Sequence, residues 1–374
     1  MVQAFSRVSD VHVFMTIERP RPLIGLGNML ILHKKTADTP AQNTGNNGTG
    51  TQELTEDDIE NGIIFDKTDS VSGANYREYL NTDAVAVDYE PDTDVLNKAT
   101  YYFSQKAHSD RVAVLTYPDG KLADALKAFW YNNWVFAIFA EAGLDDAKSV
   151  SNIFEANQDR MLFVQATNVS NLSFFKGQSY TSSWQTTGTE AIDAAIIGTL
   201  ANETVGLKNW KGKTLTGITA RDITSNERSA LERANVNAYI NVGGIPETSS
   251  GVMASGEYID SIHGDIWIKS NIEGALQHLL TSSNKIPYNQ SGINLIVSTV
   301  NTVLEKAYVQ GIIQENDATQ KGIYTVEASP RDEQPQADLS KRHYGGLKFS
   351  YKRAGAIEDI TVNGTIQTDT ILSA

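Results

Sequence analysis

Residues 111–140 read RVAVLTYPDGKLADALKAFWYNNWVFAIFA, and this stretch decides the fold. It begins with a short apolar run, RVAVLTY, which is typical of a buried strand. The turn Pro118-Asp119-Gly120 leads into LADALKAFWYNN, whose apolar residues recur at helical spacing. A second apolar run, WVFAIFA, follows directly. Strand, helix and strand in this order predict parallel strands of one sheet with a helix packed across them.

The same alternation extends to both sides, over residues 60–205. Before the central stretch we predict a strand at AVAV (84–87) and an amphipathic helix from Val95 to Phe103. After it, the helical pattern LDDAKSVSNIFEANQ is followed by the apolar run RMLFVQA (160–166) and a further helix from Glu190 to Leu200. This region is therefore expected to be a largely parallel sheet covered by helices.

The second half of the chain has a different pattern. NAYINVGG (237–244) indicates a strand that runs into a glycine turn. Two long amphipathic helices are expected from Ile259 to Leu280 and from Gly292 to Ile313, and GIYTVEAS indicates another strand. The whole chain is thus predicted to be of mixed α/β (α+β) class.

The segments near both ends alternate in polarity at period two, as extended strands do. They are VSDVHVFMTI (8–17) and the stretch 347–372, where Asn363-Gly364 offers a turn. IGLGNMLILHKK (24–35) resembles a buried strand, and the Thr-, Asn- and Gly-rich segment 36–52 resembles a flexible surface loop. A long alternating strand with no partner in its own chain is an aggregation hazard unless another chain pairs with it.

Bulk properties exclude several classes of function. The 374 residues carry a formal net charge of -14, which disfavours a general nucleic-acid binder because such proteins need a basic face. The absence of cysteine removes disulfides, thiolate metal sites and cysteine nucleophiles. We find no signal peptide and no apolar stretch of membrane-spanning length, so we expect a soluble protein made in a cytoplasm.

Candidate catalytic and cofactor sites fail on spacing. The segment GLKNWKGKT (206–214) has five residues between its glycines, whereas a phosphate-binding loop needs four, and it does not follow a strand. Gly25-Leu-Gly27 is too short for a dinucleotide fingerprint and indicates a glycine-hinged strand. No serine lies in a G-x-S-x-G elbow, so that hydrolase signature is absent. We therefore expect no catalytic residue, no cofactor and no nucleotide.

Histidines and carboxylates give no local metal site either. No two histidines are spaced three or four residues apart. We interpret His263 as a hydrogen-bonded structural residue in preference to a general base. Asp92 and Asp94, like the pair Asp145-Asp146, lie at expected helix starts, where carboxylates cap free N–H groups. The cluster WYNNW (130–134) is interpreted as core in preference to a stacking platform. The six histidines are His12, His33, His108, His263, His278 and His343.

Six segments in order resemble the sheath proteins of contractile-tailed, myovirus-type bacteriophages. Three lie in the second half: ANVNAYINVGG, ASGEYIDSIHGDIWIKSNIEGALQHLL and NKIPYNQSGINLIVSTVNTVLEKAYVQGII. The others are EYLNTDAVAVDYEPDTDVLNKATYYFSQ, GLKNWKGKTLTGIT and AGAIEDITVNGTI. Each segment alone is weak, but six in the expected order are fairly specific. The loop 36–52 has no counterpart in this resemblance.

The resemblance implies a fold and a function. An inner α/β domain would contain an inserted outer α/β domain, and extended N- and C-terminal β arms would add strands to sheets of neighbouring subunits. The function would be structural: polymerisation as stacked six-fold rings around the tail tube, followed by contraction. Partners would be further copies of the chain, the tail tube protein, and the baseplate and tail terminator proteins, without nucleic acid or membrane insertion. The expected location is the virion tail, assembled in the host cytoplasm.

This organisation divides the chain into five parts. They are an N-terminal arm (1–24), a strand with a flexible insertion (25–59), an outer domain (60–205), an inner domain (206–345) and a C-terminal arm (346–374). Alternatives are another tail or baseplate structural protein, or a nucleotide-dependent enzyme that uses residues 60–205.

Two sets of residues are predicted to act in assembly. Five cations lie between residues 340 and 357 with no acid among them, and we expect them to contact the tube: Lys341, Arg342, Lys348, Lys352 and Arg353. Residues at the bases of the arms are expected to act as hinges: Pro20, Pro22, Gly25, Gly345, Gly346 and Gly355. For the first set the alternative is a solvated patch, and for the second it is a simple end of a strand.

Overall fold

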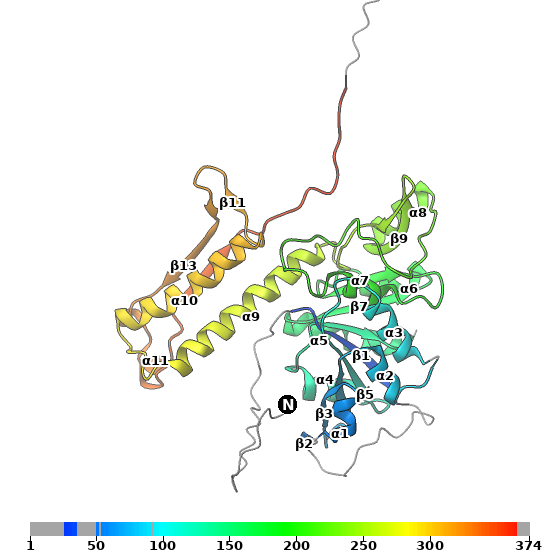
Figure 1. Ribbon diagram of the computed structural model, residues 1–374. Helices are drawn as coiled ribbons and strands as arrows, with labels where there is room; N and C mark the ends of the chain where they lie inside the picture. Colours follow the sequence, from blue (N-terminus) through cyan, green and yellow to red (C-terminus); the bar gives the residue numbers. More distant parts are fainter. Residues whose placement is uncertain (1–25, 36–49, 52–53, 92, 142, 365–374) are drawn as a thin grey trace, which may run out of the picture.

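The computed structural model describes residues 26–35, 50–51, 54–91, 93–141 and 143–364. Over these ranges the chain forms a large α/β part and an elongated part beside it (Figure 1). We call the described residues from 26 to 272 the body, residues 273–351 the lobe, and residues 354–364 the C-terminal segment. The mixed α/β class predicted from the sequence is confirmed.

A ten-stranded mixed sheet forms the centre of the body, in the order β10-β9-β8-β7-β6-β1-β5-β4-β3-β2. The strands from β9 to β5 run parallel to one another, and the strands outside them pair antiparallel. The strands are β1 (Met29–Lys34), β2 (Gly50–Thr51), β3 (Ile63–Thr68), β4 (Asn75–Tyr79), β5 (Val112–Tyr117), β6 (Phe136–Phe139), β7 (Met161–Ala166), β8 (Thr181–Gln185), β9 (Val236–Val242) and β10 (Ile245–Thr248).

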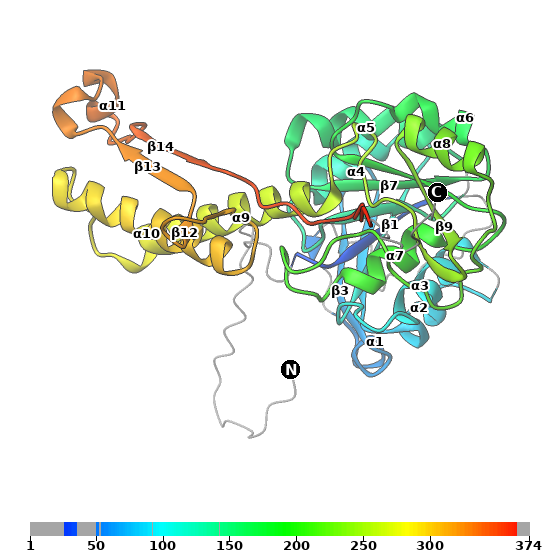
Figure 2. The same cartoon turned by 90° about the horizontal axis from the view of Figure 1, so that it is seen from above.

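Helices cover both faces of this sheet (Figure 2). One face carries α2, α3, α7 and the first turns of α9; the other carries α4, α5, α6 and α8. The helices of the body are α1 (Glu56–Glu60), α2 (Thr82–Asp88), α3 (Asp94–Phe103), α4 (Leu122–Phe129), α5 (Asp145–Asn157), α6 (Val169–Leu172), α7 (Ile192–Leu200) and α8 (Ser225–Ala234), with a 3-10 turn at Ser173–Phe175.

Strand β1 shows why its sequence forms a central strand. Met29 and Ile31 pack into the core on one face, and Leu30 and Leu32 into the core on the other. An unbroken apolar run is what a strand buried on both faces requires. At its start, Gly27 lies so close to the Ala201 carbonyl that an added Cβ would be 1.7 Å from that oxygen. The sequence therefore selects glycine where the chain enters the sheet.

One expectation is wrong, and one domain boundary lies within the sheet. AVAV (84–87) is not a strand but lies within the helix α2, whose first turn is capped by Asn81 accepting a bond from the Ala84 N–H. Four apolar residues fit either element, and the cap decides for the helix. In addition, the sheet continues from β8 into β9 and has β1 near its centre. The expected boundary at residue 205 therefore does not coincide with a break in the sheet.

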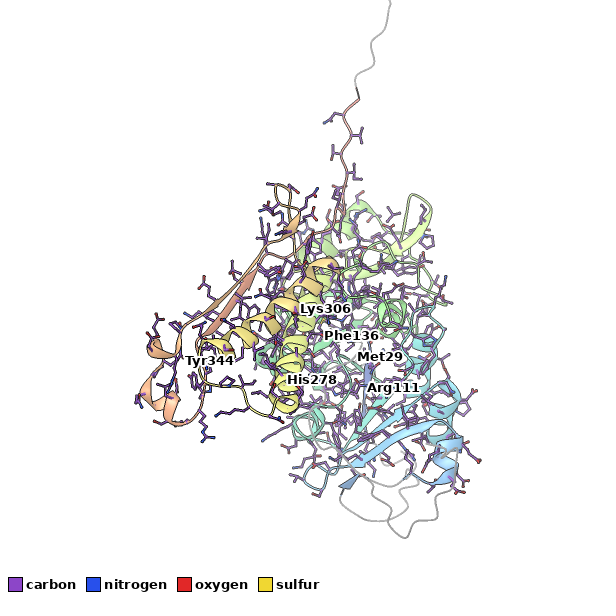
Figure 3. The ribbon with its side chains drawn as sticks, turned by 60° about the vertical axis from the view of Figure 1, so that its left-hand side comes forward. Met29, Arg111, Phe136, His278, Lys306 and Tyr344 are labelled. Carbon is purple, nitrogen blue, oxygen red and sulfur yellow. The ribbon has the colours of Figure 1, made fainter. Side chains whose placement is uncertain are left out.

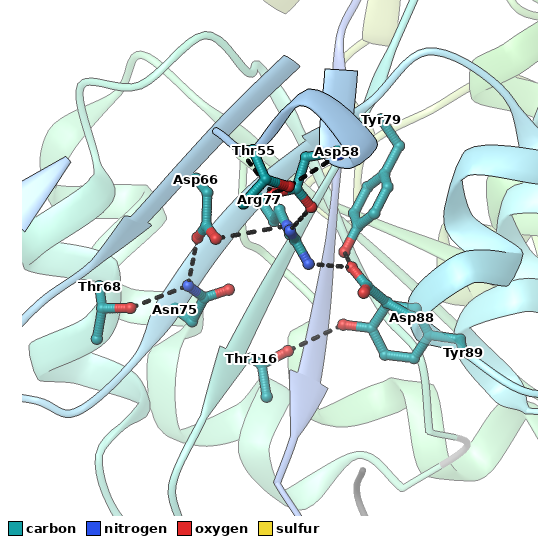
Figure 4. Close-up of polar contacts among 10 residues, drawn as sticks. All are labelled: Thr55, Asp58, Asp66, Thr68, Asn75, Arg77, Tyr79, Asp88, Tyr89 and Thr116. Carbon is teal, nitrogen blue, oxygen red and sulfur yellow. Dashed lines mark hydrogen bonds and ion pairs between the residues drawn. The ribbon is translucent and has the colours of Figure 1, made fainter. Parts of the chain in front are cut away.

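A buried charge cluster stabilises the β3–β4 edge of the sheet (Figure 4). Arg77 is 1% exposed and reaches three carboxylates: Asp58 at 2.5 Å, Asp88 at 2.7 Å and Asp66 at 3.5 Å. Asn75 donates to Asp66 at 2.6 Å. Burial raises the pKa of Asp66, although Asn75 and Arg77 oppose this shift. Removing one partner from such a cluster leaves uncompensated buried charge, so the cluster ties α1 and α2 to the sheet.

The lobe is thinner than the body and is built on two long helices. Helix α9 (Ile259–Ser282) starts in the body and runs out into the lobe, and α10 (Gln290–Val309) lies beside it (Figures 1 and 3). The buried residues of α9 end at Ile272. The other lobe elements are β11 (Glu315–Asn316), β12 (Lys321–Gly322), β13 (Tyr324–Ala328), a 3-10 turn at Arg331–Glu333, α11 (Gln336–Ser340) and β14 (Leu347–Tyr351).

Candidate assembly surface

The hairpin of β13 and β14 covers one side of the α9–α10 pair in the lobe. The two strands pair antiparallel, with Tyr324 opposite Tyr351 and Ala328 opposite Leu347. Side chains that alternate along the hairpin, including Tyr324, Val326 and Leu347, pack against the helices. The other face is exposed, and there Thr325 bonds Ser350 at 2.8 Å. The hairpin is thus anchored on one face only.

In the described part of the chain no third strand pairs with β13 or β14, although just beyond β14 Arg353 forms an isolated antiparallel bridge with Ile313. An open edge presents a row of N–H and C=O groups to a further strand. Two strands by themselves are marginal in water, so added strands would stabilise the hairpin as well as the partner. This geometry can accept an extended segment by main-chain hydrogen bonding.

An ion cluster lies at the base of the lobe, where β14 ends. Arg353 donates through Nη1 to Glu257 at 3.1 Å and through Nε to Asp265 at 3.1 Å, and its Nη2 also contacts Asp265. Tyr351 donates to the same carboxylate at 2.5 Å. Asp265 belongs to α9 and Glu257 immediately precedes that helix. The last residues of the hairpin are therefore fixed to the start of α9.

The C-terminal segment leaves the lobe from this point and crosses a loop of the body. The Ala354 N–H donates to the Ile312 carbonyl at 2.9 Å. Further on, Lys211 donates to the Glu358 carbonyl at 2.9 Å, and Asn209 lies 3.5 Å from the Glu358 carboxylate. Burial raises the pKa of Glu358, and the charge of Lys211 opposes the shift. Apolar side chains of the segment remain exposed: Ile357 at 84%, Ile360 at 76% and Val362 at 84%.

The five cations expected to contact the tube do not form one patch. Lys341 and Arg342 follow α11 at the far end of the lobe, and Lys348 lies within β14 opposite Glu327. Lys352 lies roughly 13 Å further along the strand direction than Lys348. Arg353 is paired with the two acids of the ion cluster. The acidic partners come from distant parts of the sequence, so the acid-free run at 340–357 conceals them.

The residues expected to be hinges also differ from one another. An added Cβ at Gly346 would lie 2.5 Å from Gln334 Nε2, so this glycine is packed, whereas no heavy atom lies within 4 Å of such a Cβ at Gly355. At Gly345 the nearest atom is His343 Nε2 at 3.3 Å. Pro20, Pro22 and Gly25 lie outside the described residues.

The segment 206–214 packs against the core of the body through Trp210. It adopts neither helix nor strand, and no helix follows it directly. Trp210 is 3% exposed and packs against Phe136 and Phe163, with ring centroids 5.7 and 5.5 Å away. Gly206 has a φ of +93°, and a Cβ added there would lie 2.5 Å from the backbone oxygen of Gln310, the residue that follows α10. In a phosphate-binding loop the glycines lead straight into a helix, and this segment does not.

His263 is a buried structural histidine, as interpreted from the sequence. It is 5% exposed, and its Nε2 lies 2.7 Å from the Leu26 carbonyl oxygen, to which it donates. Burial lowers the pKa of His263 to about 4, while the bond to Leu26 opposes the shift. The imidazole is therefore neutral at pH 7.

The remaining candidates have structural surroundings. His33 contacts Glu141 at 2.6 Å, and His108 contacts the Ser109 carbonyl at 2.7 Å; His278 and His343 are exposed. His12 and Asp92 lie outside the described residues. Asp94, Asp145 and Asp146 do lie in the first turns of helices, but the α3 cap is the Thr93 hydroxyl, and α5 has no side-chain cap. Trp130 and Trp134 are buried, as the core interpretation requires.

Two absences concern the described part of the chain. Among those residues, no group of three or more His, Asp or Glu side chains could hold a metal ion. No helix in the same ranges is both long and apolar enough to cross a membrane.

Comparisons with known proteins agree with this geometry. Residues 259–366 match the family model of the E217 tail sheath protein gp31-like C-terminal domain. These residues comprise α9, the lobe and the C-terminal segment, which are the parts that carry the open hairpin and the ion cluster. No curated protein matches the sequence.

Solved structures match the chain over nearly its whole length. A chain from the contracted PVC sheath complex of an extracellular contractile injection system is 9% identical, with TM-score 0.65 and 98% of each chain covered. A chain from the anti-feeding prophage baseplate is 12% identical, with TM-score 0.63, covering 97% of this chain and 100% of that chain. A chain from the contracted anti-feeding prophage sheath is 12% identical, with TM-score 0.60, covering 98% and 100%.

The resemblance to sheath proteins that the six sequence segments carried is confirmed. Residues 259–366 match the model of the E217 tail sheath protein gp31-like C-terminal domain, and the chain as a whole has the fold found in these contractile-system structures.

Proposed function

We propose that this chain is the structural subunit of a contractile tail sheath and not an enzyme. One observation carries the proposal: the part that matches the sheath family is also the part that exposes unpaired strand edges and the departing C-terminal segment. A structural subunit needs complementary surfaces for its own copies. The lobe offers an acceptor, and the C-terminal segment offers a donor with exposed apolar side chains.

Assembly then proceeds by strand exchange. The alternating stretch 347–372 begins as β14 and continues past the body, and the N-terminal arm (1–24) would act in the same way. Twenty extended residues reach at most ~66–72 Å, enough to cross onto a neighbour. Each added main-chain hydrogen bond contributes only about 1 kcal/mol, but a strand supplies several. The open edges of the β13–β14 hairpin are the acceptor that this mechanism requires.

The proposal extends to finer features of the assembly, which the same comparison supports. One matched structure is six-fold symmetrised, and two are sheaths in the contracted state. For this chain we propose stacked six-fold rings around a tail tube, with baseplate and terminator proteins at the ends, in a phage tail. The division into inner and outer domains and the hinge role of the arm bases are part of this proposal.

The tube contact is proposed to involve the cations at the far end of the lobe. Lys341 and Arg342 are exposed, and neither has an ion-pair partner among the described residues. Lys348 in β14 and Lys352 just after it are exposed and extend the proposed contact toward the base of the lobe, where Arg353 lies and is paired. Attraction to an acidic tube would steer docking and weaken with salt.

Electron microscopy of the purified full-length chain tests the proposal. Concentrated protein is expected to form tubes of regular helical pitch. Isolated rings without stacking would favour the alternative of a baseplate component, and globular monomers at all concentrations would contradict both. A thermal-shift screen with ATP, NAD and divalent metals tests the enzyme alternative, because saturation at 100 times Kd would add about 2.7 kcal/mol of stability.

A further inference from the structure

The first turns of α9 lie against the bases of both ends of the described chain. His263 holds the Leu26 carbonyl at 2.7 Å, and Leu26 is where the described chain begins. Two residues further along the same helix, Asp265 holds Tyr351 and Arg353, where the C-terminal segment begins. The start of α9 therefore contacts Leu26, the first described residue, as well as Tyr351 and Arg353, which precede the C-terminal segment.

The C-terminal segment has a second fixed point on the body. Lys211 donates to the Glu358 carbonyl at 2.9 Å from the loop that contains the buried Trp210. Because Trp210 is part of the core, this loop cannot follow the segment if it moves. Two points, at Arg353 and at Glu358, determine the line along which the segment crosses the body.

The contacts are suited to fixing a direction more than to stabilising the fold. The Arg353 side chain is 40% exposed, and half-exposed ion pairs contribute only ~0–1 kcal/mol to stability. A guanidinium is planar, however, and three of its donors here meet carboxylates on two sides. This arrangement restricts the orientation of the chain at residue 353. Between the two fixed points, Gly355 has open space around it.

We propose that Asp265, at the start of α9, and Lys211 act as positioning residues that set the exit direction of the C-terminal segment. The inference rests on the proposed function in one respect, since the exit direction matters because the segment is taken to reach a neighbouring copy. It also reassigns Arg353 from direct tube contact to an internal positioning role.

The absence of cysteine allows a direct test on the isolated subunit. Spin labels are placed at Ile360→Cys, beyond both fixed points, and at Ala128→Cys on the exposed side of α4. Double electron–electron resonance then gives the distribution of distances between them. In the otherwise unchanged chain we expect a narrow distribution.

The variant Arg353→Gln/Lys211→Ala removes both fixed points. A free coil of seven residues has an end-to-end spread of about 15 Å, so the distribution is expected to broaden to about that width. The charge-matched control Lys306→Gln/Lys208→Ala removes a cation of α10 and a second cation of the Trp210 loop, neither of which bonds Glu358, and is expected to keep the narrow distribution. Arg353→Lys in the Lys211→Ala background keeps the charge but not the planar fork, so the distribution is expected to stay broad, and Asp265→Asn in the same background should broaden it as well.

The proposal is overturned by a distribution that is already broad in the unchanged chain, or by one that stays narrow in Arg353→Gln/Lys211→Ala with an unchanged circular dichroism spectrum. Polymerisation is measured separately, by electron microscopy of the same variants without labels. If the positioning role is wrong, the distance distributions between the spin labels will show it. If the sheath assignment is wrong, the unchanged chain will form no tubes.

Discussion

Strands β5 and β14 summarise the contrast between the body and the lobe. All six residues of β5, VAVLTY, are buried, and it has strands on both sides. In β14, LKFSY, no residue is buried, and only one side is paired. A strand of the first kind gains its stability within the subunit, whereas a strand of the second kind leaves backbone groups for a partner. The body thus gains its stability within the subunit, whereas the lobe carries the backbone groups that we propose to act in assembly.

The largest effect on folding is expected from the buried cluster of the body. Arg77→Met leaves three carboxylates without their cation, and such losses typically cost about 3–5 kcal/mol in unfolding free energy. Urea unfolding followed by circular dichroism measures the change. The exposed control Arg228→Met, which loses only a surface pair with Glu232, should cost less than about 0.5 kcal/mol. Equal effects of the two variants would show that the cluster contributes no more than a surface pair.

The next largest effect is the loss of stability in acid that we expect from His263, near the start of α9. The pKa of His263 falls from 6.5 to about 4 on folding, so its neutral form is favoured in the folded state. The corresponding stability is complete above pH 6.5 and is lost as pH falls, by about 2 kcal/mol at pH 5. Asp66 and Glu78 oppose this loss of stability in acid. Burial raises their pKa values, so their protonation at low pH favours the folded state.

His263→Gln isolates this contribution, since glutamine can still donate to the Leu26 carbonyl but does not titrate. Unfolding free energies of the variant and the unchanged chain are measured at pH 7 and pH 5. The difference between the two proteins should shift by about 2 kcal/mol between these conditions. A pH-independent difference would mean that His263 is not held neutral by burial.

Charge reversal at the far end of the lobe should leave folding nearly untouched. Lys341→Glu/Arg342→Glu changes exposed residues without ion-pair partners among the described residues, so the melting temperature should stay nearly constant. Co-sedimentation with purified tail tubes should fall, most strongly at low salt. Unaltered tube binding would remove these two cations from the proposed contact.

The smallest effect is expected at the most open of the predicted hinges. Gly355→Ala places a methyl group in open space and should change stability by less than about 0.5 kcal/mol. Gly346→Ala brings a Cβ to 2.5 Å from Gln334 Nε2 and should cost about 1 kcal/mol or more, because that side chain must move. Urea midpoints of the two variants compare a free hinge with a packed one, and equal midpoints would remove the distinction.

The sequence predicted the body better than the lobe, for physical reasons. The strands β1, β5, β6 and β7 and the long helices α9 and α10 were correctly identified. A strand buried on both faces leaves a continuous apolar run, and a helix buried on one stripe leaves a helical period. Strands β4 and β8, NYREY and TSSWQ, were not identified. Both strands bury polar side chains, such as Arg77, which pairs with Asp58 and Asp88, and Ser182, which donates to the Val252 carbonyl, so no apolar run marks them.

The candidate assembly residues were found only in part. The run of cations drew attention to residues 341–353, but Asp265, Glu257 and Lys211 carry no local signal. They act through contacts that span more than eighty residues of sequence, such as Asp265 with Arg353. Pairing of this kind is created by the fold, so single-sequence patterns cannot reveal it.

The central claim is that the body folds by itself while the C-terminal segment joins subunits. Its most direct test is a chain that lacks residues 354–374, compared with the full chain by thermal melting and by electron microscopy. The truncated chain keeps Arg353 and the whole lobe, so we expect an almost unchanged melting temperature and no regular tubes. Regular tubes from the truncated chain, under conditions in which the full chain also forms them, would contradict this account.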